Sequence, residues 1–391
     1  MEGTLKICLT ALTLSLANPE VPRNAKWLVK FITAYAIFSA TAAIVFYNIY
    51  LEIINKNLSK ACENGIISLI YGGVTMKYII LLWHSETVKE IINTMRRDIE
   101  MFKELTAEEQ KIVEEYFRKQ NFVWKLWLFF CSMTGLMFFF QSLGSMLYYF
   151  FIGDFKLVPL FDLVYPDFVE NKKDNLIIFL TTFILLGYCF TYGGVVVWAV
   201  SGLGPMSMLH ACLRLELIER RLYKLYSGEL TRVNKKLNGI AKELQEIYNF
   251  VELIERCFTL YYEFILKLST FIIPFTLYQL LNSIGVKRRE FNLEFTTFII
   301  TGITISAYPC YYSDMLMEKG EDVRLAAYSC GWEAHYHRRV RSSLLLILIR
   351  TSRPVAIRTA FRTISLIALS EVRDPSGDQY KTRASSPSEN H

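Results

Sequence analysis

Charged residues are scarce in this chain, and their scarcity excludes most classes of soluble protein. Only 20% of the 391 residues are Asp, Glu, Lys or Arg, against roughly 25% in a typical soluble domain. Hydrophobic residues make up 52% of the chain, and the mean hydropathy is +0.26. The hydrophobic residues fall into long blocks, which is typical of membrane helices and not of a soluble helical bundle.

Six of these blocks are long and apolar enough to cross a membrane, because a spanning helix needs about 20 predominantly apolar residues. They cover Trp27–Leu51, Gly65–His84, Phe122–Phe151, Leu176–Met206, Tyr262–Val286 and Phe291–Met317. A seventh block, Leu344–Leu369, is interrupted. The predicted fold class is therefore an all-α membrane protein, a seven-transmembrane helix bundle.

Positive charge predicts the orientation of the bundle. The segments on the same side of the membrane as the amino terminus carry 24 Lys and Arg residues; they are 1–26, 85–121, 207–261 and 318–342. The segments on the opposite side carry 8; they are 52–64, 152–175 and 287–290. Cytoplasmic loops are enriched in Lys and Arg, so we predict a cytoplasmic amino terminus. Seven spans would then leave the carboxyl terminus outside, the reverse of a G-protein-coupled receptor.

Neither a disulfide framework nor a cleavable signal peptide is evident. On this topology only Cys62, one of eight cysteines, lies in an outside loop, and the others lie in spans or face the reducing cytosol. The first apolar run, Leu9–Ala17, is short and contains Thr10, Thr13 and Ser15, unlike the apolar core of a signal peptide. Structural disulfides are not expected.

Motifs for catalysis, metal binding and nucleic-acid binding are missing. The hydrolase motif G-x-S-x-G and the phosphate-binding motif G-x-x-x-x-G-K-[ST] do not occur. Gly202–Pro205 is rich in glycine, but it is predicted to end a membrane helix and follows no strand, so it does not form a phosphate-binding loop. Glu333, His335 and His337 lie close together, but they fall on different helix faces and lack further ligands. The net charge of +6 lies mostly in loops and follows topology. No enzyme activity, cofactor, metal or nucleic-acid partner is expected.

Two cytoplasmic segments show helical periodicity. The segment 85–121 is predicted to extend the second span as an amphipathic helix, on the spacing of Val88, Ile91, Met95, Ile99 and Phe102. Thr106 and Glu109 form a capping box that opens the next helix. The segment 207–261 contains a heptad seam that serves helix packing, subunit assembly or both: Leu237, Ile240, Leu244, Ile247, Val251, Ile254, Phe258 and Tyr261.

The stretch from Tyr308 to Pro354 has the most distinctive order of elements. A hydrophobic helix is predicted to end at Pro309 and Cys310, and a charged helical segment follows, with Tyr328 and Trp332 four positions apart on one face. Paired arginines, an apolar run and a basic break complete the order: Arg338, Arg339, Leu344–Ile349, Arg350, Arg353 and Pro354. This order resembles the carboxyl-terminal region of insect odorant receptors.

The resemblance implies an odorant receptor subunit in the plasma membrane, surrounded by lipid. It implies a ligand-gated, non-selective cation channel, formed as a hetero-tetramer with the olfactory co-receptor. The subunits would meet at a cytoplasmic helical anchor, to which we assign Leu244, Val251, Tyr328 and Trp332.

The resemblance also implies a pocket for a small volatile odorant in the outer halves of the second, third, fourth and sixth spans. An apolar, aromatic lining would hold such a molecule with few fixed hydrogen bonds. The residues expected there equally suit packing against lipid or the protein core: Tyr71, Thr75, Phe139, Leu143, Met146, Phe183, Gly187, Phe190 and Ile303.

The carboxyl end departs from the family pattern. Val355–Leu369 follows the pore-lining helix of the family, but Arg358, Arg362 and Glu371 oppose insertion, and the aromatic closing segment is absent. Our hypothesis is a truncated or alternatively spliced product. The predicted organisation is a cytoplasmic segment 1–26, a membrane bundle 27–317, an anchor with an incomplete pore helix 318–372, and a disordered tail 373–391.

Two alternatives share part of this pattern. A gustatory-type chemoreceptor of the same superfamily would have the same layout. A secondary transporter would show broken helices and buried ionisable residues in two related halves, and neither a repeat nor a buried charge pair is evident in the sequence.

Overall fold

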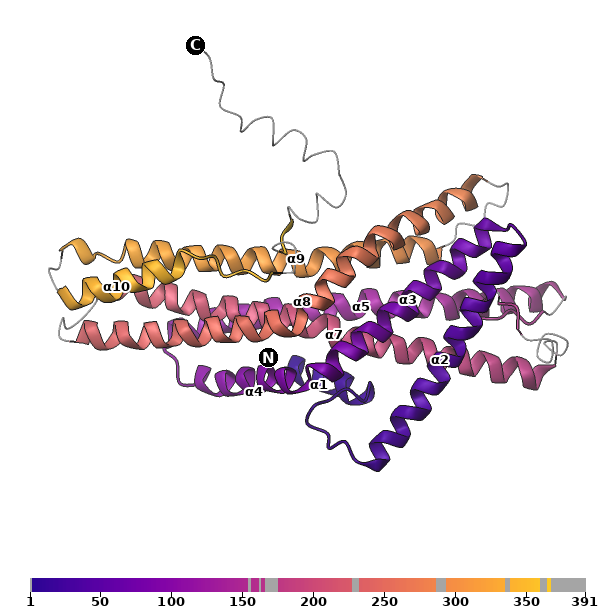
Figure 1. Cartoon of the computed structure of the whole chain (residues 1–391), viewed down its shortest axis with the longest axis horizontal. Coiled ribbons are helices and arrows are strands. Elements are labelled where there is room, and N and C mark those ends of the chain that lie inside the picture. The colour runs from indigo at the N-terminus through magenta and orange to yellow at the C-terminus, as the bar shows by residue number, and fades with distance from the viewer. Residues whose placement is uncertain are drawn as a thin grey trace, which may run out of the picture. The chain divides into compact units, whose positions relative to one another are not determined.

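The computed structural model describes residues 2–153, 156–161, 163–165, 175–226, 232–285, 293–334, 338–358 and 364–366. Helices make up the regular structure of these ranges, and the described residues contain no extended strand (Figure 1). The all-α class predicted from the sequence is confirmed.

The first half of the chain forms five helices of different lengths, from 13 residues in α1 to 46 in α5. They are α1 (Glu2–Leu14), α2 (Ala25–Ile54), α3 (Leu58–Trp83), α4 (Ser85–Phe102) and α5 (Ala107–Ile152). Asn24 and Asn57 cap α2 and α3, because their side-chain oxygens accept hydrogen bonds from the backbone of Trp27 and Lys60.

The second half consists of three long helices and two shorter elements. They are α7 (Leu176–Tyr223), α8 (Val233–Gly285), α9 (Leu293–Tyr328), the 3₁₀ turn η2 (Trp332–Ala334) and α10 (Arg338–Thr351). The helices α5, α7 and α8 have 46, 48 and 53 residues. Each is more than twice the length that crosses a bilayer, which takes about 20 residues.

The chain divides into two compact units. Unit 1 comprises Met1–Lys89, Asn121–Leu203 and Lys267–Ile305, and unit 2 comprises Glu90–Gln120, Gly204–Leu266 and Ser306–His391. The helices α4, α5, α7, α8 and α9 contribute residues to both units.

Five helices of the described chain are long and apolar enough to cross a membrane: α2, α3, α5, α7 and α8. The sixth predicted span forms α9, but α9 is not among the five because threonines between Thr296 and Thr304, together with Ser306 and Pro309, lower its hydropathy. In the seventh predicted block, α10 ends at Thr351, and residues 355–358 are not helical. The rest of that block, apart from 364–366, and the predicted tail 373–391 lie outside the described residues.

Prolines do not end the helices where the sequence suggests. The helix α7 continues through Pro205 to Tyr223, and α9 continues through Pro309 to Tyr328. The predictions that Gly202–Pro205 and Pro309–Cys310 end membrane helices are therefore wrong. A proline removes one backbone hydrogen bond, and a long helix packed against its neighbours tolerates that loss.

The helix after the second span forms as predicted but is a separate element. Its predicted apolar face is buried: Val88, Ile91, Met95, Ile99 and Phe102. It follows the second span directly, because α3 ends at Trp83 and α4 begins at Ser85, with His84 between them. The capping box at the start of α5 is confirmed, since the backbone N–H of Thr106 donates to Glu109 and the backbone N–H of Glu109 donates to the Thr106 hydroxyl.

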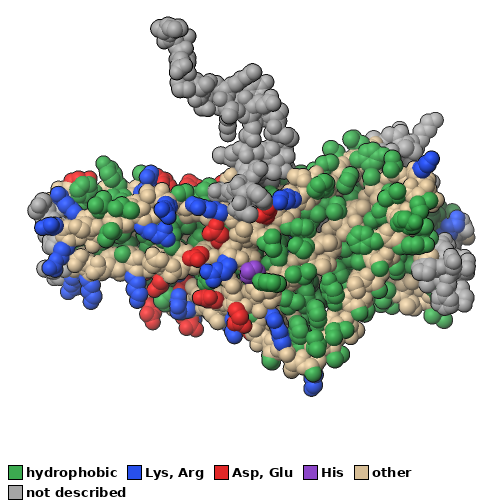
Figure 2. All heavy atoms as spheres, in the orientation of Figure 1, with side chains coloured by type: hydrophobic (Ala, Val, Ile, Leu, Met, Phe, Trp, Pro, Cys, Tyr) green, Lys and Arg blue, Asp and Glu red, His purple; other side chains and the backbone are tan. Residues whose placement is uncertain are grey.

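Unit 1 carries hydrophobic side chains on its surface as well as in its core. Phe46, Tyr50, Phe122 and Ile177 are among the exposed ones, each more than half exposed. In Figure 2 hydrophobic side chains cover the visible faces of α2 and α3, which pack along each other. Apolar surface on this scale marks a membrane-facing region.

Unit 2 contains a buried network of charged side chains. Asp98 on α4 is fully buried, and its Oδ2 atom lies 3.0 Å from His210 Nε2 and 3.2 Å from an Arg214 nitrogen. Arg214 also contacts Glu246 on α8 at 3.3 Å. This network joins α4, α7 and α8.

The heptad seam of α8 is buried within unit 2. All eight of its apolar residues, from Leu237 to Tyr261, are buried.

Lys319 on α9 forms a second set of ion pairs in unit 2. Its Nζ atom lies 3.2 Å from Glu216 and 3.0 Å from Asp322. Burial alone would lower the pKa of Lys319, but its hydrogen bond to Asp322 and the Glu216 carboxylate raise that pKa to about 12.

The aromatic pair predicted to share a helix face does not do so. The helix α9 ends at Tyr328, Gly331 adopts a positive φ of 87°, and Trp332 belongs to η2. Tyr328 is 62% exposed, and Trp332 is half-buried beneath the Arg341 guanidinium. The chain's own packing thus leaves Tyr328 uncovered, because the left-handed turn at Gly331 ends the helix.

Candidate ligand site

Unit 1 contains an apolar cavity of about 170 Å³ between its helices. Residues from α2, α3, α5, α7, α8 and α9 line it: Phe38, Ile70, Tyr71, Val74, Cys131, Gly135, Cys189, Phe190, Gly193, Gly194, Val197, Ile272, Phe298, Thr301, Gly302 and Ile305. A cavity of roughly 150 Å³ with an apolar lining holds a molecule the size of benzene. The size and lining therefore suit one small ring or a short alkyl chain.

Glycines create the space in this cavity. Gly135 faces the Phe190 ring so closely that an added Cβ atom would lie 3.2 Å from it. On α7, Gly193 faces Val74 and Phe38, whereas a Cβ atom at Gly194 would meet nothing within 4 Å. The absence of side chains at these positions brings α3, α5 and α7 together while leaving room for a ligand.

A short chain of polar groups lies in the cavity wall. The Tyr71 hydroxyl donates to Thr41 Oγ1 at 3.2 Å, and Thr41 Oγ1 lies 3.3 Å from the Cys189 sulfur. Thr41 is buried, and Tyr71 and Cys189 both line the cavity. These contacts fix the Tyr71 ring and hold its hydroxyl in place.

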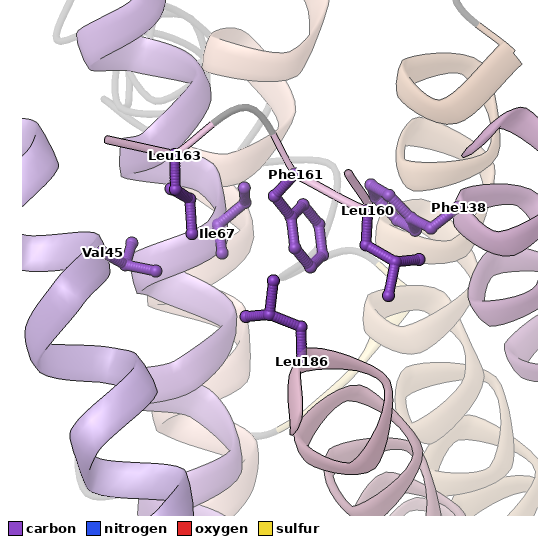
Figure 3. Packing of buried hydrophobic residues seen from close by; sticks show 7 residues of the cluster. All are labelled: Val45, Ile67, Phe138, Leu160, Phe161, Leu163 and Leu186. Carbon is purple, nitrogen blue, oxygen red and sulfur yellow. The ribbon is translucent and has the colours of Figure 1, made fainter. Parts of the chain in front are cut away.

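The loop after α5 fills the end of the bundle. Leu160, Phe161 and Leu163 belong to a buried cluster with Val45, Ile67, Phe138 and Leu186, and Figure 3 shows Phe161 pointing toward Leu186. The loop therefore acts as part of the core of unit 1.

Two helix side chains fasten this loop. Asn48 on α2 donates to the Val164 carbonyl at 2.9 Å and accepts from the Val164 N–H at 2.7 Å. The Ser142 hydroxyl on α5 donates to the Val158 carbonyl at 2.6 Å. Both side chains are buried, and their three hydrogen bonds attach the loop to α2 and α5.

A second, more polar cavity of about 400 Å³ lies beneath the same loop. Its lining includes Glu63, Gln141, Ser145 and Lys156 as well as Phe138, Phe161 and Phe298. Phe298 lines both cavities, and its ring centroid lies 5.4 Å from that of Phe138. A layer of packed aromatic rings thus separates a polar vestibule from the apolar cavity.

Two of the nine residues predicted to line the pocket, Tyr71 and Phe190, line the apolar cavity. Phe139, Phe183 and Gly187 lie together around the loop, because the Phe139 and Phe183 rings are 6.2 Å apart and Gly187 faces Phe139. These three line neither cavity, and neither do the remaining four. Of the four, Thr75, Met146 and Ile303 are half-buried, and Leu143 is 52% exposed.

On α5 and α7 the cavity lies further from the loop than the predicted residues, whereas on α3 and α9 it lies at their level. On α5 it is lined by Gly135 and Cys131, on α7 it extends to Val197, and on α9 Gly302 and Ile305 line it on either side of Ile303. The loop side chains Leu160, Phe161 and Leu163 belong to the cluster against which Phe139, Phe183 and Phe190 pack. The adjacent Gly193 and Gly194 are the sequence signal that could have indicated the deeper position.

The other predicted features have mixed outcomes. Leu244 and Val251 of the predicted anchor are buried within unit 2. All eight cysteines are free. Within the described ranges no group of three or more His, Cys, Asp or Glu residues could hold a metal ion, and His335 and His337 lie outside them.

Two solved structures similar to this chain are of an insect olfactory receptor. The chain is similar to the insect olfactory receptor OR5 from Machilis hrabei in complex with eugenol, with a TM-score of 0.77, 14% identity, and coverage of 98% of this chain and 97% of that chain. The structure of the same receptor described without eugenol gives a TM-score of 0.76 at 15% identity, with 97% of each chain covered. At this identity the likeness shows the fold, a seven-transmembrane helix bundle.

A comparison with curated proteins finds no match. The family model described as 7tm Odorant receptor matches residues 57–373, which is most of the chain. Because that match covers more than half of the chain, this membrane protein belongs to the odorant receptor family.

Proposed function

We propose that this chain is an odorant receptor subunit whose apolar cavity in unit 1 binds a small volatile molecule. The observation that carries the proposal is the apolar cavity of about 170 Å³, lined by six helices in a chain of the odorant receptor family. An insect olfactory receptor of the same fold is described in complex with eugenol.

The proposed response is opening of a non-selective cation channel formed with the olfactory co-receptor in the plasma membrane. A ligand shifts this equilibrium only by its differential affinity for the open state. Because the cavity is lined by six helices, a change in their packing alters the free energy of the ligand complex. This physical link supports a receptor in which ligand binding and helix rearrangement are coupled.

We place assembly with the co-receptor on exposed apolar side chains of unit 2. Tyr328 is 62% exposed, and Leu345, Leu346 and Ile349 of α10 are each more than half exposed. Leu244 and Val251 are already buried within the chain, so in this proposal they support the anchor from within. Trp332 stands beside Tyr328 with its indole N–H donating to the Tyr328 carbonyl at 2.8 Å.

The cavity can be tested by filling it. In Gly194→Leu, a side chain would enter the cavity, because a Cβ atom at Gly194 has nothing within 4 Å. We expect the half-maximal concentration of any activating odorant to rise about tenfold or more, since lost burial of a few methylene groups costs about 0.8 kcal/mol each. Whole-cell currents from cells co-expressing the co-receptor measure this change.

A matched control separates cavity filling from a general effect of leucine in a membrane helix. Gly72 on α3 is exposed and also has nothing within 4 Å of an added Cβ atom, but it lines neither cavity. Gly72→Leu should leave the half-maximal concentration unchanged. Equal effects in the two variants would contradict the cavity assignment. No current with any odorant in the unsubstituted chain would contradict the proposed channel and would agree with the incomplete pore helix predicted from the sequence.

A further inference from the structure

A lysine is buried within unit 1, one helical turn beyond the end of the apolar cavity. Lys77 on α3 is only 5% exposed, and its Nζ atom lies 3.4 Å from the hydroxyl of Ser201 on α7. Ionisable residues within membrane helices are rare, and where they occur they generally mark functional sites. Lys77 is therefore a candidate functional residue next to the cavity.

Helix periodicity relates Lys77 to the cavity. Val74 and Val197 line the cavity, and Lys77 and Ser201 follow them by three and four residues on α3 and α7. Positions three or four apart lie on the same face of a helix, and one turn advances about 5.4 Å. Lys77 and Ser201 thus lie directly beyond the cavity lining on two facing helices.

The direction of the lysine side chain relates it to the cavity. Side chains on a helix lean toward its amino-terminal end, and on α3 the cavity-lining residue Val74 lies in that direction from Lys77. A lysine side chain has a flexible stem with four methylene groups and a head with three donors. Its head can therefore reach an acceptor atom held at that end of the cavity.

Elsewhere the cavity wall offers weak polar contacts. The Tyr71 hydroxyl already donates to Thr41, and most of the other lining residues are aliphatic, aromatic or glycine. A hydrogen bond that involves a charged group is roughly twice as strong as a neutral one. An oxygen atom at one end of a ligand would find its strongest partner at the Lys77 end.

We propose that Lys77 forms the polar end of the odorant site and selects ligands with an apolar body and one terminal oxygen acceptor, such as a ketone or an ester. This inference rests on the proposed function and adds the chemical class of the ligand. The ligand's ring or alkyl chain lies against Phe38, Phe190 and Val74, and its carbonyl oxygen accepts a hydrogen bond from Lys77. A hydrocarbon of the same shape fills the cavity without that bond.

The test compares two ligands of matched shape on the purified full chain in lipid nanodiscs. Acetophenone and ethylbenzene have the same carbon skeleton, but acetophenone has a carbonyl group next to the ring where ethylbenzene has a methylene group. Changes in intrinsic tryptophan fluorescence report the affinity for each. The affinity ratio between a variant and the unsubstituted chain cancels the different partitioning of the two compounds into lipid.

In Lys77→Met, the apolar stem remains and the donor is lost. We expect the affinity for acetophenone to fall about tenfold or more, the range for loss of a hydrogen bond to a charged group, while the affinity for ethylbenzene is unchanged or rises. The matched control is Lys30→Met, which removes an exposed lysine from α2. A fall of equal size for both compounds in Lys77→Met would overturn the proposal.

A measurement on the unsubstituted chain covers the case in which Lys77→Met does not fold. The carbonyl stretching band of bound acetophenone should lie below its position in a hydrocarbon solvent, because a hydrogen bond weakens the C=O bond. A band at the hydrocarbon position would overturn the role of Lys77. If the unsubstituted chain binds neither compound nor any other small volatile molecule, the proposed function itself fails.

Discussion

Gly202 shows how a single missing side chain allows two helices of unit 1 to approach. An added Cβ atom would lie 1.5 Å from a ring carbon of Trp124, which is itself buried. The sequence context suggested only a helix end at this glycine. The structure shows instead that the α7 backbone at Gly202 is the surface on which the Trp124 ring of α5 rests.

We expect Gly202→Ala to destabilise the protein by about 1–3 kcal/mol, the usual cost of overpacking a well-packed core. The midpoint of thermal unfolding in detergent measures the change. Gly72→Ala is the control, because its Cβ atom meets nothing within 4 Å and alanine favours a helix by about 1 kcal/mol over glycine. Recovery in the double variant Gly202→Ala/Trp124→Leu would identify the ring contact as the cause, and a lack of recovery would count against it.

At the scale of an element, the loop after α5 depends on a few side-chain bonds. Replacing Asn48 with Leu removes both hydrogen bonds to Val164 and leaves the N–H and carbonyl group of Val164 without that partner. Each lost hydrogen bond costs about 0.5–1.5 kcal/mol. We expect amide hydrogen exchange in residues 156–165 to rise strongly in Asn48→Leu and to a smaller extent in Ser142→Ala.

The control for this prediction is Thr181→Ala. The Thr181 hydroxyl also bonds a backbone carbonyl, but that carbonyl belongs to Ile177 in its own helix. Exchange in 156–165 should stay unchanged in this variant. If Asn48→Leu leaves the exchange of the loop as it was, the loop is held by Leu160, Phe161 and Leu163 alone.

The buried network of unit 2 joins three elements through one carboxylate. Asp98→Asn keeps the shape of the side chain but removes the charge that faces His210 and Arg214. Loss of a partner from a buried ionic contact is strongly destabilising, and we expect a decrease of about 1–3 kcal/mol in the free energy of unfolding because Asn retains a hydrogen-bonding oxygen.

An exposed pair provides the comparison for Asp98. Glu252 and Arg256 form an ion pair one turn apart on α8, with side chains 67% and 60% exposed. Glu252→Gln should cost less than about 0.5 kcal/mol, as is usual for exposed pairs of this spacing. Chemical denaturation of the solubilised protein distinguishes the two variants, and equal costs would refute the structural role of the Asp98 network.

At the scale of the whole molecule, the contrast between the two units agrees with a chain that crosses a membrane and continues beyond it. The helix α8 has 53 residues, about 80 Å at 1.5 Å per residue, whereas the hydrocarbon core of a bilayer is about 30 Å thick. Unit 1 exposes apolar side chains, and unit 2 contains the networks of Asp98 and Lys319.

We predict that the amino terminus and the connection between α7 and α8 both face the cytoplasm. The reason is the excess of 24 over 8 Lys and Arg residues between the two sets of loops. Epitope tags at both places should stain only after cells are permeabilised. Staining of either tag on intact cells would contradict the orientation. For a tag that stains under neither condition, a protease-protection assay at the same site gives the orientation.

The sequence by itself determined the features that depend on local pattern. Apolar blocks predicted the helices, the spacing of Val88 to Phe102 predicted the buried face of α4, and the heptad seam predicted the buried face of α8. Thr106 and Glu109 predicted a helix start. These features follow from neighbours within one helix, where a period of 3.6 residues is enough to assign a face.

Only the tertiary structure decided which residues surround the cavity. Leu160, Phe161 and Leu163 return from a loop to fill the end of the bundle, so the cavity lies beside Gly193 and Gly194 and not beside Leu143 or Met146. The burial of Lys77 beyond that cavity and the exposure of Tyr328 after the turn at Gly331 are decided in the same way. Each depends on residues distant in the sequence or on one backbone angle, and neither hydrophobic periodicity nor composition contains that information.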